Sequence, residues 1–282
     1  MTRTRLGLIG DNIKASRAPD LHRFCGQLTG LDVSYDLFIP PLMGMSFEEV
    51  FENCRTSGLA GINVTLPYKE RVVRHVAIED PNIARIGAVN TVRFGDDGPR
   101  GFNTDYSGFV SAFRAAFGNL SPGRVVMIGA GGVGKAVAFG LLVLGAEEIV
   151  FVDKDTAKAD ALAQAVAGAG AGTTRARTAG IEALAGADGV VNCTPLGMVG
   201  YPGSPVPEGA FPAGAWAFDA VYTPVETPFR TQAITAGGRF LSGYELFFHQ
   251  GIDAFLIFTG RQPDDLAELR RMLLAAPPPD ES

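Results

Sequence analysis

A glycine-rich turn between an apolar strand and a predicted helix is the segment whose residue types and spacing point most directly to chemistry. The chain reads Val125-Val-Met-Ile-Gly-Ala-Gly-Gly-Val-Gly134, so Gly129, Gly131 and Gly134 match the spacing G-x-G-x-x-G. The first glycine allows a tight turn, the second lets the backbone approach a pyrophosphate, and the third allows close packing of helix on sheet. Amides at the start of the helix then bind phosphates without a basic side chain. The turn predicts a dinucleotide site formed by Gly129, Ala130, Gly131, Gly132, Val133 and Gly134.

Asp153 follows the next predicted strand, residues 149–152, and supports the same prediction. It lies about 20 residues after the glycines, where a carboxylate accepts hydrogen bonds from the adenosine ribose hydroxyls. Its charge repels a ribose 2′-phosphate, which favours NAD over NADP. Lys154 and Lys158 are close enough in sequence to weaken this discrimination, so NADP is possible and Lys158 is counted in the cofactor site. The alternative is a glycine-rich turn in a flavodoxin-like sheet, with Asp153 as a helix cap.

Three further segments place polar residues beside the ends of predicted strands. They are Asn63-Val-Thr-Leu-Pro-Tyr-Lys69, Gly87-Ala-Val-Asn-Thr91 and Gly101-Phe-Asn-Thr-Asp105. Taken one residue at a time, the simpler interpretation is favoured. Lys69 is then a solvated lysine in the first turn of a helix that opens at Pro67, and Asp105 is the N-cap of the following helix.

Alternating strand and helix signals describe the elements that must position these residues. Strand patterns occur at residues 6–9, 33–39, 62–66 and 88–94. Helices are predicted to begin at Pro19 and after Ser46, and residues 105–117 form a connecting helix. A second alternating block starts at residue 124, and residues 244–274 are predicted to be helical. Two consecutive alternating blocks predict an α/β chain with two parallel-sheet domains.

Composition excludes several classes of protein. The chain has 282 residues, of which 46% are apolar, and this is enough for two buried cores. The formal net charge of −6, without a basic stripe, argues against a nucleic-acid partner. Three cysteines and three histidines show no ligand-like spacing, so no metal is expected. No apolar segment reaches the roughly 20 residues that span a bilayer. We therefore expect a cytoplasmic protein with no membrane partner.

The polar segments, taken in order along the chain, resemble those of the shikimate dehydrogenase family. The resemblance continues through Asn192-Cys-Thr-Pro-Leu-Gly-Met198, Asp219-Ala-Val-Tyr222 and His249-Gln250, and covers nearly the whole chain. Within the family the chain is most similar to the NAD-preferring quinate/shikimate dehydrogenases. The resemblance implies an N-terminal substrate-binding α/β domain at residues 1–104 and a Rossmann-type NAD(P)-binding domain at residues 105–243. It implies that C-terminal helices, residues 244–282, return to the substrate domain.

The resemblance also implies roles for single residues. It makes Lys69 and Asp105 the catalytic pair, and whether Lys69 carries the proton or orients the substrate stays open. Substrate-binding roles fall to Ser16, Asn63, Thr65, Asn90 and Gln250. Further cofactor contacts are implied for Cys193, Thr194, Pro195, Met198, Val221, Tyr222 and Gly243. Core packing is the alternative for Met198 and Tyr222, and a small buried thiol is the simpler interpretation of Cys193.

One position departs from the family pattern. The loop Ala15-Ser-Arg-Ala-Pro19 matches a segment that usually presents two hydroxyl residues to the substrate carboxylate, but Ala18 stands at the second. The missing hydrogen bond to a charged acceptor is worth roughly 1.5–3 kcal/mol in general. Arg17 could compensate, although a solvent-facing loop cation is the simpler interpretation.

The function implied is oxidation of a ring hydroxyl in a small acid such as shikimate, quinate or a close relative, by hydride transfer to NAD(P). The protein would be a monomer or a homodimer. Two alternatives stay open: a catalytically silent sensor of such a metabolite, and a Rossmann dehydrogenase for a different ring acid such as an aminoshikimate. Turnover with the ring acids separates the first alternative from an enzyme.

Overall fold

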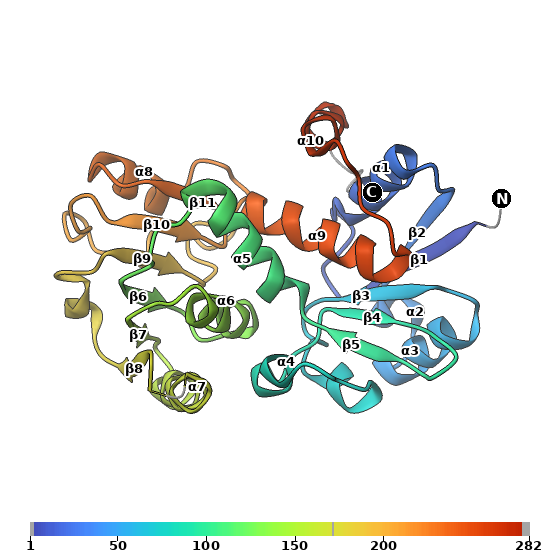
Figure 1. Ribbon diagram of the computed structural model, residues 1–282, viewed down its shortest axis with the longest axis horizontal. Helices are drawn as coiled ribbons and strands as arrows, with labels where there is room; N and C mark the ends of the chain where they lie inside the picture. Colours follow the sequence, from blue (N-terminus) through green and yellow to red (C-terminus); the bar gives the residue numbers. More distant parts are fainter. Residues whose placement is uncertain (1–2, 171, 278–282) are drawn as a thin grey trace. The chain divides into compact units, whose positions relative to one another are not determined.

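Two separate β-sheets organise the chain, one in each of two compact units (Figure 1). The computed structural model describes residues 3–170 and 172–277. The first unit comprises Met1–Thr104 and Gln250–Ser282, and the second comprises Asp105–His249. Residues 278–282, part of the predicted C-terminal segment, lie outside the described residues. No described helix is long and apolar enough to cross a membrane.

The sheet of the first unit has five strands in the order β2-β1-β3-β4-β5. Its strands are β1 (Thr4–Ile9), β2 (Val33–Phe38), β3 (Gly61–Val64), β4 (Thr91–Arg93) and β5 (Arg100–Phe102). β1 is parallel to β2 and β3, whereas β4 is antiparallel to both β3 and β5. The expectation of a wholly parallel first sheet is therefore wrong at β4, which runs antiparallel to the other four strands. The short connection from β4 to β5 explains part of the difference, because only antiparallel neighbours can be joined by a hairpin.

Short helices cover the strands of the first unit. They are α1 (Ala18–Thr29), α2 (Pro40–Met43), α3 (Phe47–Thr56), the 3₁₀ helix η1 (Arg71–His75), α4 (Pro81–Ile86) and α10 (Leu266–Ala275). α1 ends at Gly30 in the left-handed conformation, and α3 starts with a capping box between Ser46 and Glu49. Both features agree with the local sequence signals.

The helix expected to open at Pro67 is absent, and the structure corrects that prediction. The Leu66–Pro67 peptide bond is cis, turns follow it, and η1 begins only at Arg71. Tyr68 is buried in the core of this unit and stacks on Phe47 with ring centroids 4.8 Å apart. The chain after β3 therefore turns into the core, and Lys69 lies on a turn.

The second unit contains a six-stranded sheet in the order β11-β10-β9-β6-β7-β8. Its strands are β6 (Arg124–Ile128), β7 (Glu148–Val152), β8 (Arg175–Thr178), β9 (Gly189–Asn192), β10 (Trp216–Asp219) and β11 (Phe240–Ser242). Every neighbouring pair is parallel, as the sequence predicts for this block. The strand order reverses between β6 and β9, and ligands of open parallel sheets bind at such a switch point.

Helices of the second unit connect these strands. They are α5 (Thr104–Phe117), α6 (Gly132–Val143), α7 (Thr156–Ala169), the 3₁₀ helix η2 (Ile181–Leu184) and α8 (Pro228–Thr235). α9 (Gly243–Thr259) starts in the second unit and ends in the first. Gly140 of α6 lets the helix approach Phe109 of α5, because an added Cβ would lie 2.6 Å from that ring. This contact holds α5 against α6, which carries the glycine turn at its start.

Candidate active site

The glycine turn between β6 and α6 has the geometry that close backbone approach requires. Gly129 has φ +102°, and a Cβ there would lie 2.7 Å from the carbonyl of Cys193. A Cβ on Gly134 would lie 2.4 Å from the carbonyl oxygen of Gly129. In contrast, a Cβ on Gly131 or Gly132 would meet nothing within 4 Å. No side chain caps the start of α6, so its first amides are available to an anion such as a pyrophosphate.

Asp153, directly after β7, is held against this turn. Its Oδ2 accepts a hydrogen bond from the Ala130 amide at 2.7 Å, and its Oδ1 accepts one from the Asp155 amide at 2.9 Å. Asp155, not Asp153, is the N-cap of α7, so the helix-cap alternative for Asp153 is wrong. A carboxylate has about four acceptor sites, which leaves capacity for ribose hydroxyls. The Lys158 ammonium lies 3.3 Å from the Asp155 carboxylate and forms an ion pair with it.

A buried polar cluster shapes the loops after β9 and β10. Asn192 donates to Asp219 Oδ1 at 2.9 Å, and Thr227 donates to Asp219 Oδ2 at 2.7 Å. The Val221 amide also donates to Asp219 Oδ1 at 3.0 Å. Burial raises the pKa of Asp219, and these three hydrogen bonds oppose the rise. Through these bonds one carboxylate fixes both loops that carry predicted cofactor residues.

The residues on those loops differ in exposure. Met198 is 41% exposed and Tyr222 is 37% exposed, so neither has the core-packing role that was the alternative. The Thr194 amide and hydroxyl donate to Asn192 Oδ1 at 2.9 and 2.7 Å. Cys193 is half-buried, and burial raises the pKa of its thiol. Gly243 allows a second close approach, because a Cβ there would lie 2.3 Å from the Ala220 carbonyl oxygen.

In the first unit, the loop before α1 presents one hydroxyl. Ser16 Oγ accepts from the Ala18 amide at 3.2 Å, and among the described residues its hydrogen has no acceptor. Arg17 donates through Nη2 to the Leu273 carbonyl at 2.7 Å and lies 3.1 Å from Asp20. The guanidinium is therefore tied to α10 and to its own helix. This arrangement does not support the idea that Arg17 compensates for Ala18.

Asn90 is fixed at the start of β4 by its amide oxygen. Oδ1 accepts from the Thr104 amide at 2.7 Å and from the Thr91 hydroxyl at 3.1 Å. A backbone N–H can only donate, so it determines which way the carboxamide faces. Within the described residues, Asn90 Nδ2 has no hydrogen-bond partner and is not sealed from solvent. The Thr104 hydroxyl also lies 3.3 Å from Gln250 Oε1, so Thr104 contacts both predicted ligands.

Lys69 and Asp105 are both nearly buried, at 9% and 8% exposure. The interpretation of Lys69 as a solvated lysine is therefore wrong. Its backbone carbonyl accepts from the Val89 amide at 2.8 Å, which ties the turn to the segment before β4. Asp105 lies in the first turn of α5, where a negative charge is favourable.

Asn63 is also buried, and its carboxamide is used by neighbouring groups. Its Nδ2 donates to the Asn90 carbonyl and the Thr91 hydroxyl, and its Oδ1 accepts from the Tyr35 phenol. Tyr35, Thr91 and Thr104 were not singled out from the sequence. Tyr35 lies on β2, Thr91 on β4 and Thr104 at the start of α5, and only the fold brings them to Asn63 and Asn90, so no local pattern predicts these contacts.

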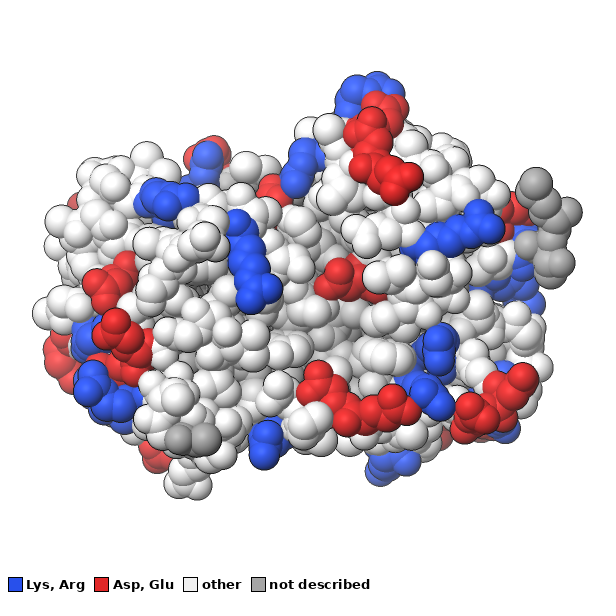
Figure 2. Space-filling view, viewed as in Figure 1, with Lys and Arg blue, Asp and Glu red and all other residues white. Residues whose placement is uncertain are grey.

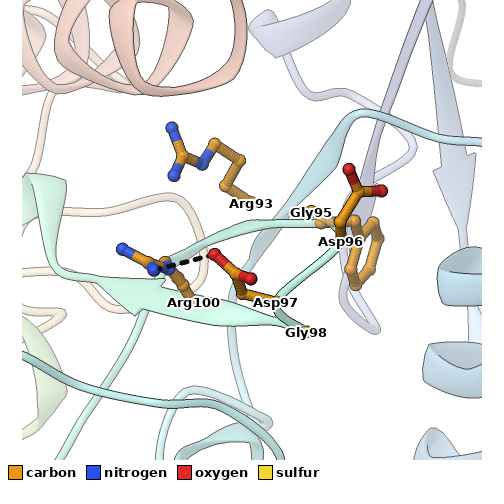
Figure 3. A pocket seen from close by; sticks show the side chains of 7 residues that line it. Arg93, Gly95, Asp96, Asp97, Gly98 and Arg100 are labelled. Atoms are coloured by element: carbon orange, nitrogen blue, oxygen red, sulfur yellow. Dashed lines mark hydrogen bonds and ion pairs between the residues drawn. The ribbon is translucent and has the colours of Figure 1, made fainter.

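A separate hollow of about 380 Å³ lies at the β4–β5 hairpin (Figure 3). It is lined by residues 93–98 and Arg100, and it contains none of the predicted site residues. Arg100 pairs with Asp97 and Glu79 at 3.3 and 2.8 Å. The polar side chains that line this hollow belong to the surface of the β4–β5 hairpin, so we do not assign the hollow to the site.

Charge on the visible face is mixed: Figure 2 shows basic and acidic side chains interspersed, without a continuous basic surface. Among the described residues, no group of three or more His, Cys, Asp or Glu side chains is placed to hold a metal ion. Recognition of an anionic ligand therefore has to come from individual groups.

The second unit, with its parallel sheet and a glycine turn at the switch point, is a Rossmann-type dinucleotide-binding domain of the kind found in NAD(P)-linked oxidoreductases. Residues 8–92 match the family described as shikimate dehydrogenase substrate binding domain. The quinate/shikimate dehydrogenase (NAD(+)) of Corynebacterium efficiens is 39% identical, over 92% of this chain and 94% of that protein. The chain belongs to the shikimate dehydrogenase family, whose members oxidise CH–OH groups with NAD or NADP.

Other relatives differ in the cofactor that their names state. The shikimate dehydrogenase (NADP(+)) of Pseudarthrobacter chlorophenolicus is 38% identical, over 92% of this chain and 90% of that protein. Among solved structures, quinate dehydrogenase from Corynebacterium glutamicum in complex with NAD has a TM-score of 0.90 at 33% identity. That match covers 98% of this chain and 100% of the other. The fold class predicted from the sequence is thus confirmed, apart from the antiparallel strand β4.

Proposed function

We propose that this chain reversibly oxidises a ring hydroxyl of a shikimate- or quinate-type polyhydroxy acid, with NAD preferred over NADP. The observation that supports the substrate class is that three polar groups of the predicted substrate ligands have no hydrogen-bond partner among the described residues. These are the Ser16 hydroxyl hydrogen, the Thr65 hydroxyl and Asn90 Nδ2. Such groups suit a ligand with several hydroxyls. An analogue that lacks these hydroxyls would leave the polar groups of the site unpaired, so the site rejects it. Gln250, whose Oε1 lies 3.3 Å from the Thr104 hydroxyl, is a further proposed substrate ligand.

The proposed cofactor site fits a nicotinamide dinucleotide. Gly131 and Gly132 leave open space beside uncapped helix amides, and Asp153 retains acceptor capacity for a ribose. The carboxylate would repel a 2′-phosphate, and Lys158 is paired with Asp155. The names of relatives support the same preference, because they include NAD(+) quinate/shikimate dehydrogenases. When bound, the dinucleotide would supply the hydride acceptor.

Lys69 and Asp105 are proposed to handle the proton. Oxidising a secondary alcohol requires a proton to leave the oxygen as hydride leaves the carbon, and a positioned general base contributes typically 10²–10⁴-fold to such a step. Lys69 would accept that proton or hold the hydroxyl by a hydrogen bond. Asp105 would orient the ammonium. Both side chains are nearly buried, which strengthens electrostatic interactions between them and a substrate.

The first experiment measures NAD reduction with quinate and with shikimate, in the parent and in Lys69→Ala. We expect turnover of at least one acid, a higher kcat/KM with NAD than with NADP, and a drop in kcat of about 100-fold or more in Lys69→Ala. Arg93→Ala is the matched control, because Arg93 is an exposed cation of the first unit and has no ion-pair partner among the described residues. Turnover of neither acid would refute the substrate class, and full activity of Lys69→Ala would refute the proton role. Tight ligand binding without turnover would instead indicate a sensor.

A further inference from the structure

A buried histidine–tyrosine pair contacts Asn63 from inside the first unit. His22 lies on α1, and Tyr35 lies on β2. Their rings stack with centroids 4.7 Å apart and an interplanar angle of 14°. The Tyr35 phenol donates to Asn63 Oδ1 at 2.8 Å. Neither residue belongs to the proposed set of substrate ligands, yet both contact a side chain from the Asn63–Lys69 motif.

The hydrogen bonds of Asn63 leave only one orientation for its carboxamide. Nδ2 donates to the Asn90 carbonyl at 3.2 Å and to the Thr91 hydroxyl at 3.0 Å, which uses both of its hydrogens. Oδ1 then accepts from the Tyr35 phenol at 2.8 Å, and the Tyr35 ring is held by its stack on His22.

Through its Nδ2, Asn63 donates to Thr91, which is one of the residues that fix Asn90. The Thr91 hydroxyl lies 3.0 Å from the Thr104 hydroxyl and donates to Asn90 Oδ1 at 3.1 Å. The Thr104 amide donates to the same oxygen at 2.7 Å. These bonds hold Asn90 Oδ1 on the inside, so Nδ2 is the group left for a ligand. Asn63 has no comparable free atom among the described residues.

His22 is a neutral residue of this cluster. Its ring lies against Tyr35, Asn63, Phe255 and Phe258, and none of them carries a charge at neutral pH. Burial lowers the pKa of His22 from 6.5 to about 3, so the ring keeps a single N–H. Its Nδ1 is buried without a hydrogen-bond partner. An unpaired buried nitrogen is unfavourable for folding alone, so stability does not explain a histidine at this position.

We infer that His22 and Tyr35 are positioning residues for substrate binding: the Tyr35 phenol, whose ring is stacked on His22, donates to Asn63 Oδ1 and orients Asn63, which holds Asn90 and Thr91 so that Asn90 Nδ2 is directed to a ring hydroxyl. Asn63 itself then acts through Asn90. The inference rests on the proposed function for the identity of the ligand, and on the hydrogen bonds above for the positioning. Polar networks of this kind specify one arrangement when their members are bonded.

Tyr35→Phe tests the inference, because it removes the phenol donor and keeps the stacked ring. We expect KM for the ring acid to rise about three- to tenfold, with KM for NAD unchanged and kcat within about twofold. Exchange of the Thr104 amide hydrogen, followed by NMR, should become faster because its acceptor is less firmly held. Tyr201→Phe is the matched control, since Tyr201 is exposed and its hydroxyl makes no hydrogen bond among the described residues.

Two further variants separate positioning from general packing. His22→Ala, which removes the ring that stacks on Tyr35, should raise the ring-acid KM as Tyr35→Phe does, whereas His22→Phe, which keeps an aromatic ring, should recover part of the loss. In an Asn63→Ala background, Tyr35→Phe should add nothing further. The inference is overturned if Tyr35→Phe matches Tyr201→Phe in ring-acid KM and Thr104 exchange, or if KM for NAD rises equally. If the parent turns over neither acid, the proposed function fails, and Thr104 exchange still decides the positioning.

Discussion

The loop before α1 carries the Ser16 hydroxyl, which is proposed to bind the substrate carboxylate, but no second hydroxyl at position 18. Arg17 does not supply the missing donor, because its guanidinium is bonded to Leu273 and paired with Asp20. Ala18 has a methyl group where serine would have a hydroxymethyl group, and we expect this difference to determine how strongly the carboxylate is bound. The position is therefore a place where affinity can be gained.

Ala18→Ser should lower KM for quinate or shikimate by about tenfold and leave kcat nearly unchanged. A hydrogen bond to a charged acceptor contributes roughly 1.5–3 kcal/mol, and the contact would stabilise substrate and transition state alike. Steady-state kinetics at saturating NAD measure the effect. Ala15→Ser, in the same loop at an exposed position, is the control. An unchanged KM in Ala18→Ser would mean that the carboxylate does not lie near this loop.

At the level of elements, the glycine turn determines how closely α6 approaches the sheet. The Gly134 position has no room for a side chain, because a Cβ would meet the Gly129 carbonyl at 2.4 Å. Gly168 is also helical, in α7, but a Cβ there meets nothing within 4 Å. The two positions therefore separate the general effect of alanine in a helix from the effect of the turn.

Gly134→Ala should weaken NAD binding at least tenfold and lower the free energy of unfolding by about 1–3 kcal/mol, because the helix start must move away from the turn. Gly168→Ala should instead leave NAD binding unchanged and raise the unfolding free energy by about 0.5–1 kcal/mol. Calorimetric titration with NAD and urea unfolding test both variants. Equal NAD affinities of Gly134→Ala and Gly168→Ala would show that the turn does not bind the cofactor.

Local signals explain which elements were predictable from the sequence. In the second sheet, β6 and β7 were predictable because each is an apolar run followed directly by Gly129 or Asp153, so the signal lies within a few residues. The direction of β4 could not be predicted from the sequence, because a strand of three residues, Thr91–Arg93, shows no periodicity. Its pairing with β3 determines the direction. Pro67 was misread because burial of Tyr68, a tertiary effect, overrides the helix-start signal.

The candidate site divides in the same way. Asp153 and the glycines followed from spacing, and Lys69, Asp105 and Asn90 followed from resemblance; their roles stay predictions. His22 and Tyr35 gave no signal of a site, because a histidine and a tyrosine at buried positions of a helix and a strand look like core residues. Asn63 is 28 residues from Tyr35, and only the sheet order brings the two together.

For the molecule as a whole, His22 makes folding sensitive to mild acid. The folded protein keeps this ring neutral down to about pH 3, whereas the unfolded chain protonates it below its ordinary pKa of 6.5. Between these values the unfolded state binds one more proton, so stability falls as pH falls. The cost is about 1.4 kcal/mol for each pH unit below 6.5.

Between pH 6.5 and 5, the parent should therefore lose about 2 kcal/mol more unfolding free energy than His22→Phe. Few carboxylates titrate in this window, so the difference isolates the histidine. Denaturant unfolding of both proteins at several pH values provides the measurement. Parallel pH profiles for the two proteins would contradict this prediction.

The cytoplasmic location and the monomeric or dimeric state stay predictions.

The bond between Asp153 and the Ala130 amide has a practical consequence for redesign. An engineer who wants to switch the coenzyme would naturally delete the acid and add a cation nearby. Asp153 Oδ2 also accepts the hydrogen bond that holds the glycine turn, and this turn is proposed to bind the diphosphate. A successful exchange would have to retain an acceptor for that amide while giving up the charge, so asparagine is a better starting point than alanine.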